Sequence, residues 1–257
     1  MLDKSFFEAY LSLLDTDITG TFKEIEAKEL SRENFNFYTA VSVMSSSRIE
    51  GEKLEIDSYV KHKMQHIEYL SDLTEKPNDL FEAYEFASKA RLTKENFLEA
   101  HSIATRHLLP AQWRGVIRTG NMVIMDHHSN QVQYEAASAG IVKKEFEKFW
   151  DELEKLLPPG MNIDGIFYFA SMIHLVFVKI HPFNDGNGRT ARLLEKWFLS
   201  EKLGEKAWYI PSEYYYYTHI TDYYKNLARV GLFYDDLSYK NSPPFLVMLP
   251  KALVTEK

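Results

Sequence analysis

Hydrophobic side chains recur every three or four residues along most of this chain. Near its start, Phe6, Phe7, Tyr10, Leu11 and Leu14 follow this spacing, which gathers them on one face of a helix. The same periodicity predicts further helices over residues 34–49, 53–73, 78–90, 93–107, 143–157, 165–180, 187–203 and 212–232.

The pattern changes between residues 113 and 134. Residues 116–118, 122–125 and 131–134 are short β-prone runs, and the turn-forming residues 126–130 stand between the last two. Runs of this kind predict one isolated β-hairpin. Since repeats and low-complexity linkers are absent from the sequence, we expect a single mainly α-helical unit that carries this hairpin.

Composition narrows the class of protein. Of the 257 residues, 45% are hydrophobic, which is enough to bury a sizeable core. The absence of cysteine excludes disulfides and thiolate metal sites, and a net charge of −7 does not favour nucleic-acid binding. The most apolar stretch, 166–180, is shorter than the ~20 residues of a membrane span and contains His174 and Lys179. We therefore expect a buried helix, no membrane association and a cytoplasmic protein.

One loop concentrates polar chemistry. Residues 181–192 read HPFNDGNGRTAR and lie between two predicted helices. Glycines and free N–H groups at a helix start bind phosphates, and Asp185 supplies a carboxylate of the kind that holds Mg²⁺ beside phosphate oxygens. Arg189 and Arg192 fall on one helix face and provide positive charge, while His181 accepts a proton near pH 7. These residues suit phosphoryl-type transfer from a nucleotide to a hydroxyl.

The loop resembles the signature of the Fic family (filamentation induced by cyclic AMP), H-P-F-x-D/E-G-N-G-R-x-x-R, at every fixed position. Residues 113–118, WRGVIR, resemble the family segment that leads into a flap hairpin. Pro211-Ser212 and residues 223–227, YYKNL, resemble later family elements, so the resemblance covers about residues 92–232. It implies a fido fold with a helical core (91–232) and a hairpin flap. Residues 1–90 would form an additional N-terminal helical region, and residues 233–257 a tail packed on the core.

The resemblance also implies a role for each residue of the loop. His181 would deprotonate the attacking hydroxyl, and Asp185 would coordinate Mg²⁺. Phe183 would anchor the loop in the core. The phosphates of ATP would be bound by Gly186, Asn187, Gly188, Arg189 and Arg192, the last of these holding the γ-phosphate. Gly188 places the chain with relatives that transfer AMP.

Two further regions receive roles from the same resemblance. The flap, with Val123, Ile124, Met125 and Val132, would dock the target segment by strand addition. The adenine would be bordered by Tyr223, Tyr224 and Asn226.

An upstream segment resembles the inhibitory motif of the family, S/T-x-x-x-E-G/N. Ser46 and Glu50 lie one helical turn apart, and Gly51 follows as a helix cap. The resemblance implies that Glu50 pairs with Arg192 and so competes with the γ-phosphate. We expect a protein adenylyltransferase that is autoinhibited by its own N-terminal helix, with ATP and a protein hydroxyl, its own included, as substrates.

Alternatives remain open at this point. The same site could remove AMP from a modified protein, or the chain could be a nucleotide-binding module without turnover. Other nucleotide donors and a homodimer are compatible with the sequence. His62 and His66 are spaced for a metal but are flanked by lysines, so we interpret them as solvated, as we do the predicted hairpin tip at His127 and His128.

Overall fold

Two long helices form the centre of the fold. In the computed structural model, which describes residues 1–27, 30–125 and 132–254, α8 (Ile163–Ile180) packs against α9 (Asn187–Leu203). The Asn162 side chain accepts a hydrogen bond from Gly165 N–H at 3.1 Å and caps the start of α8. By length and composition α8 could cross a membrane, but 83% of it is buried inside the protein, as expected for a core helix.

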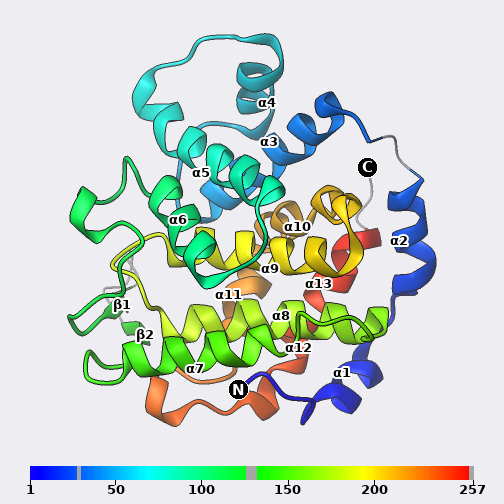
Figure 1. Cartoon of the computed structure of the whole chain (residues 1–257), viewed down its shortest axis with the longest axis vertical. Coiled ribbons are helices and arrows are strands. Elements are labelled where there is room, and N and C mark those ends of the chain that lie inside the picture. The colour runs from blue at the N-terminus through cyan, green and yellow to red at the C-terminus, as the bar shows by residue number, and fades with distance from the viewer. Residues whose placement is uncertain (28–29, 126–131, 255–257) are drawn as a thin grey trace.

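The other helices surround this pair (Figure 1). The amphipathic α7 (Val142–Glu154) packs on α8, and α6 (Lys94–Ala104) packs on α5 (Ser71–Lys89) and α9. The N-terminal helix α3 (Arg32–Ile49) contacts α5, α9, α4 (Ile56–Gln65) and α10 (Ser212–Thr218), so it lies in the interior with its C-terminal half buried. The surrounding helices are α1 (Phe7–Leu13), α2 (Ile18–Glu26), α3 (Arg32–Ile49), α4 (Ile56–Gln65), α5 (Ser71–Lys89), α6 (Lys94–Ala104), α7 (Val142–Glu154), α10 (Ser212–Thr218), α11 (Ile220–Ala228), α12 (Pro243–Leu246) and α13 (Met248–Lys251).

A two-stranded antiparallel hairpin, the flap, lies beside the end of α8 that carries His181 (Figure 1). Its strands are β1 (Val123–Met125) and β2 (Val132–Glu135), and Ile124 pairs with Tyr134 in the register. Glu135 N–H also donates to the Leu232 carbonyl at 2.8 Å. This bond ties the outer edge of β2 to the chain after α11, whereas β1 has no backbone partner other than β2 among the described residues.

The predicted fold class is confirmed: the protein is mainly helical with one hairpin. Several predicted elements were wrong in extent. The helix predicted over 53–73 is interrupted by His66, whose backbone is left-handed with φ of 58°, and α2 was not predicted. Residues 116–118 form no strand, because Arg118 N–H donates to the Pro182 carbonyl at 2.9 Å instead of to a ladder partner.

The helix predicted over 212–232 is divided between α10 and α11. The break falls at His219, where the side chains of Thr218 and His219 both bond to the Tyr215 carbonyl, at 3.2 and 3.0 Å. Such side-chain bonds compete with the helical backbone bonds. Tyr223 and Tyr224 of α11 line the same cavity as His181.

Candidate active site

His181 ends α8 in a left-handed conformation, with φ of 53° and ψ of 60°. Its Nδ1 lies 3.2 Å from the Val178 carbonyl oxygen, and this contact requires Nδ1 to carry the hydrogen. Nε2 is therefore left as a proton acceptor. Burial lowers the pKa of His181 to about 4, and the nearby positive charge of Arg118 adds to the effect against the bond to Val178. The ring is neutral at pH 7, as a general base must be.

Arg118 fixes the backbone that carries His181. It is 2% exposed, and its Nε donates to the His181 carbonyl at 2.8 Å. Its two terminal nitrogens donate to the carbonyls of Gly120, which precedes β1, and of Ala137, which follows β2. One side chain thus connects the loop after α8 to both ends of the hairpin segment, a role that the sequence motif around residues 113–118 did not indicate.

The loop after His181 is held in the core by Phe183 and Asn187. Phe183 is fully buried, which agrees with its predicted anchoring role. The Asn187 side chain brackets the Phe183 backbone: its Oδ1 accepts from Phe183 N–H at 2.9 Å, and its Nδ2 donates to the Phe183 carbonyl at 2.8 Å. The Asn187 side chain therefore shapes the loop, and only its backbone remains to bind an anion.

A glycine opens α9 without capping it. Gly186 has φ of +78°, and a Cβ there would lie 2.6 Å from Thr105 Cγ2, so both conformation and space require glycine. Because Gly186 has no side chain, no side-chain cap is present at the first N–H groups of α9. These groups and the helix dipole form a site for an anion.

The His101 side chain of α6 packs against this loop, a role that the sequence did not indicate. Its ring stacks on Phe183 with centroids 3.6 Å apart. Gly115 N–H donates to Nδ1 at 2.8 Å, so Nε2 carries the hydrogen and donates to the Asp185 carbonyl at 3.0 Å. In the sequence, His101 is indistinguishable from any buried position of an amphipathic helix.

Asp185 is exposed at the loop surface. One of its carboxylate oxygens accepts from Gly186 N–H at 2.6 Å. The described residues contain no group of three or more side chains that could hold a metal ion. A single exposed carboxylate suits Mg²⁺, which takes one or two protein carboxylates together with substrate phosphates.

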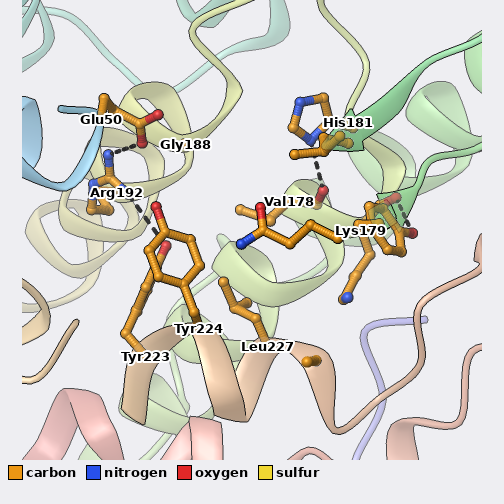
Figure 2. Close-up of a pocket in the computed structure, with 13 residues that line it drawn as sticks. Glu50, Val178, Lys179, His181, Gly188, Arg192, Tyr223, Tyr224 and Leu227 are labelled. Carbon is orange, nitrogen blue, oxygen red and sulfur yellow. Dashed lines mark hydrogen bonds and ion pairs between the residues drawn. The ribbon is translucent and has the colours of Figure 1, made fainter. Parts of the chain in front are cut away.

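Arg192 is fully buried and its contacts come mainly from α3. Its Nε donates to Ser46 Oγ at 2.8 Å, and its Nη2 donates to the Ser46 carbonyl at 3.1 Å and to Glu50 Oε1 at 2.6 Å. Its Nη1 lies 3.3 Å from the hydroxyl of Tyr223 (Figure 2). Ser46 and Glu50 thus share the face of α3 that the sequence predicted, and both meet Arg192.

Glu50 is ionised in this arrangement. Burial opposes its charge, but Arg192 and Arg189 outweigh that effect and hold the pKa of Glu50 below its usual range. A Cβ on Gly188 would collide with Glu50 Oε1, so a glycine at 188 is what admits the carboxylate. Figure 2 shows Glu50 beside Gly188 and Arg192, across the cavity from His181.

A second carboxylate, Glu52, occupies the other arginine of the loop. Its Oε1 lies 3.2 Å from Arg189 Nη2 and 3.0 Å from Lys76 Nζ of α5. Gly51, with φ of +90°, ends α3, and Glu52 N–H returns to the Ser47 carbonyl at 3.0 Å. This cap directs both Glu50 and Glu52 toward α9. The sequence motif does not include Glu52.

The cavity beside His181 has a volume of about 150 Å³, which is below the roughly 300–1,000 Å³ of typical ligand pockets. Glu50, His181, Gly188 and Arg192 line it, together with Lys179. The arginine end is therefore filled by protein side chains in this conformation.

Of the three residues predicted to border the adenine, two line this cavity. Tyr223 and Tyr224 line it from α11. Asn226 does not line it, because its side chain faces α12 and donates to the Pro244 carbonyl at 3.2 Å. The Tyr223 hydroxyl contacts Arg192. Tyr223 therefore lies closer to the predicted phosphate-binding residue than we expected for a residue that borders the adenine.

The flap forms the opposite wall. Ile124 faces the cavity, whereas Val123, Met125 and Val132 are 40–46% exposed. The predicted hairpin tip with His127 and His128 lies outside the described residues.

Comparison with known proteins agrees with this geometry. Residues 91–199 match the Fic/DOC family. Over 60 residues, 23% of this chain, the sequence is 40% identical to a uridine 5′-monophosphate transferase of Xanthomonas campestris pv. campestris (strain 8004). The match spans only 11% of that curated relative.

Solved structures share the fold over 92% of this chain. A Fic family protein from Desulfovibrio desulfuricans G20 superposes with a TM-score of 0.75 at 23% identity over 70% of its own chain. A Fic domain containing signaling protein from Bacteroides thetaiotaomicron VPI-5482 superposes with a TM-score of 0.69 at 18% identity over 93% of its own chain. The protein carries a Fic/DOC family domain and has the Fic fold.

Proposed function

We propose that this protein is a nucleotidyltransferase that moves AMP from Mg·ATP to a Ser, Thr or Tyr hydroxyl of a protein. The observation that carries the proposal is the pairing of a neutral His181, whose Nε2 is free to accept a proton, with an uncapped helix start and two buried arginines. A base, an anion site and positive charge are what nucleotidyl transfer to a hydroxyl requires.

The reaction follows from these positions. His181 Nε2 accepts the proton of the hydroxyl while the oxygen forms a bond to the α-phosphorus. The bond from the α-phosphorus to the bridging oxygen breaks, and pyrophosphate leaves. The N-terminal N–H groups of α9, Arg189 and Arg192 stabilise the phosphate charges. Asp185 would hold Mg²⁺, which neutralises phosphate charge when it is bound.

The flap supports a protein as the acceptor. The edge of β1 has no partner among the described residues, so an extended peptide can pair with it. Strand pairing binds the backbone of the target and leaves its hydroxyl side chain to reach His181.

We further propose that α3 holds the enzyme in an inhibited state. Glu50 takes the hydrogen bonds of Arg192 that a terminal phosphate needs, and its negative charge repels the triphosphate. Glu52 does the same at Arg189. ATP bound beside these carboxylates would be displaced, and a shift of about 1 Å costs on the order of 100-fold in rate.

The test is labelling with α-phosphate-tagged ATP. The Glu50→Gly protein should label itself or proteins of a cell lysate strongly, the unaltered protein weakly, and Glu50→Gly with His181→Ala not at all. Intact-mass spectrometry identifies the added AMP. Equal labelling of all three would contradict both the mechanism and the inhibition.

UMP is a second candidate for the transferred group. The curated relative is named as a uridine 5′-monophosphate transferase, and none of the contacts described above selects one base over another. Parallel labelling of the Glu50→Gly protein with α-tagged ATP and α-tagged UTP decides between the donors.

A further inference from the structure

A buried chain of three side chains reaches Arg192 from the side opposite α3. Glu195 of α9, His174 of α8 and Tyr223 of α11 are each at most 2% exposed. Glu195 Oε2 lies 2.8 Å from His174 Nδ1, and His174 Nε2 lies 2.9 Å from the Tyr223 hydroxyl. The Tyr223 oxygen then meets Arg192 Nη1 at 3.3 Å.

The directions of these hydrogen bonds follow from the chemistry of the groups. Arg192 has only hydrogens to donate, so the Tyr223 oxygen must accept from it. The Tyr223 hydrogen is then directed to His174 Nε2, and His174 Nδ1–H donates to the Glu195 carboxylate. This is the arrangement in which every hydrogen of the chain has an acceptor.

The hydrogen bonds that join Glu195, His174, Tyr223 and Arg192 involve no residue of α3. The other contacts of Arg192, with Ser46 and Glu50, all come from α3 and its cap. The chain through Tyr223 and His174 instead begins on α9 at Glu195 and returns to α9 at Arg192. If α3 withdraws, Arg192 keeps its contact with Tyr223, and Tyr223 keeps its orientation through His174.

We propose that Glu195, His174 and Tyr223 position Arg192 to bind the terminal phosphate once Glu50 is displaced. This inference rests on the proposed function, because it takes Arg192 as a phosphate-binding residue. It places Tyr223 beside the phosphate-binding Arg192, and it gives His174 of α8 the role of orienting Tyr223.

Substitutions at His174 can remove its hydrogen bond with Tyr223 and keep its hydrogen bond with Glu195. His174→Asn can still donate to Glu195 from a position near Nδ1, but it is too short to accept from Tyr223. His174→Gln can reach the position of Nε2 and accept there with its amide oxygen. Tyr223→Phe removes the contact with Arg192 directly.

Tyr216→Phe is the matched control. The Tyr216 hydroxyl donates to the same oxygen of Glu195 at 2.8 Å and is equally buried, but it is not on the path to Arg192. Its loss should lower thermal stability by an amount similar to Tyr223→Phe without changing phosphate binding.

The experiment measures dissociation constants of Mg·ATP and Mg·ADP by calorimetry. All variants are made in a Glu50→Gly, His181→Ala parent, which lacks the carboxylate on Arg192 and the proposed base and should therefore bind ATP without consuming it. The parent should prefer Mg·ATP. Tyr223→Phe and His174→Asn should weaken Mg·ATP binding about tenfold, while Mg·ADP binding changes less than twofold. Tyr223→Phe leaves Arg192 Nη1 without its acceptor, and His174→Asn leaves the Tyr223 hydroxyl without the acceptor that orients it. His174→Gln should restore most of the preference.

Two results would overturn the positioning chain. One is an unchanged ATP-to-ADP preference in both Tyr223→Phe and His174→Asn. The other is an equal loss of preference in Tyr216→Phe, which would indicate general destabilisation. A parent without any preference for Mg·ATP would instead contradict the role of Arg192 itself, and the positioning chain with it. The separate labelling test shows whether the transferase proposal fails too.

Discussion

His101 is a buried histidine whose surroundings fit only the neutral ring. Its Nδ1 accepts from Gly115 N–H, so a proton there would displace that bond. Burial lowers the pKa of His101 to about 4, against the opposing bond to the Asp185 carbonyl. An unfolded chain returns it to about 6.5. Because the unfolded state then binds the proton and the folded state does not, stability is present above pH 6.5 and is lost as the pH falls toward 4.

The matched variant is His101→Gln, which still has a donor for Asp185 but does not titrate. Between pH 6 and 5 its free energy of unfolding should fall less steeply than that of the unaltered protein, by up to about 1.4 kcal/mol per pH unit. Urea denaturation at several pH values measures the slopes. Equal slopes for the two proteins would show that His101 does not titrate on unfolding.

His181 leads to a prediction about rate. With a pKa of about 4, it is already deprotonated throughout the range from pH 6 to 8. The kcat/KM for labelling by the Glu50→Gly protein should therefore be flat across that range and fall only in acid, as the proton returns to Nε2. A pH profile of initial labelling rates measures this. A rise centred near pH 6.5 would mean that burial does not lower the pKa in the free enzyme.

At the scale of elements, polar contacts join α3 to α9 beside the candidate site. Ser42, Ser46 and Glu50 recur at intervals of four along α3, and they meet Lys196 and Arg192 of α9. Such an interface is held by hydrogen bonds as well as apolar packing. Separating the two helices would break these hydrogen bonds and expose buried apolar residues of α3 such as Val43 and Met44.

Glu52 extends this contact to Arg189, and its contribution can be measured. Glu52→Gln keeps the shape of the side chain but removes the charge, so Arg189 becomes available to phosphate. Since a partly buried ion pair is worth about 1 kcal/mol, labelling with α-tagged ATP should rise about fivefold, and it should rise further in combination with Glu50→Gly. Glu55→Gln is the control, because Glu55 pairs with Arg48 at 3.3 Å and its side chain is 69% exposed. A Glu52→Gln protein that labels no more than this control would exclude Glu52 from the inhibition.

The sequence was sufficient for those elements whose signals are local. The period of the apolar residues located α3, α8 and α9, and the spacing of Ser46 and Glu50 predicted their common face. The breaks at His66 and His219 were missed because side-chain bonds and a left-handed residue, not the hydrophobic pattern, end those helices. His101 was missed for a different reason: its partners lie far away in the chain, and no spacing rule connects them.

At the scale of the whole molecule, the N-terminal region and the family core share one interior. The buried apolar residues form a cluster that runs from Leu2 through Val43 and Tyr84 to Leu253. The polar interior is shared as well, since Lys196 donates to Ser42 of α3 at 2.7 Å. The division at residue 90, expected from the sequence, therefore marks a boundary of the family match and not a gap in packing.

This shared interior predicts cooperative unfolding. A fragment of residues 91–257 would expose the faces of α9 and α10 that α3 covers, and it would leave the buried pair of Lys196 and Glu213 without its partners Ser42 and Tyr84. The lost hydrogen bonds to this charged pair and the exposed apolar surface together cost several kcal/mol, which is of the order of the whole stability of a domain. We expect the fragment not to fold alone.

The full chain should unfold in one transition, with far-UV circular dichroism and the fluorescence of the buried tryptophans giving the same midpoint in urea. Two separated transitions, or a soluble and folded 91–257 fragment, would show that α3 is a detachable segment, and inhibition would then require only its release as a unit.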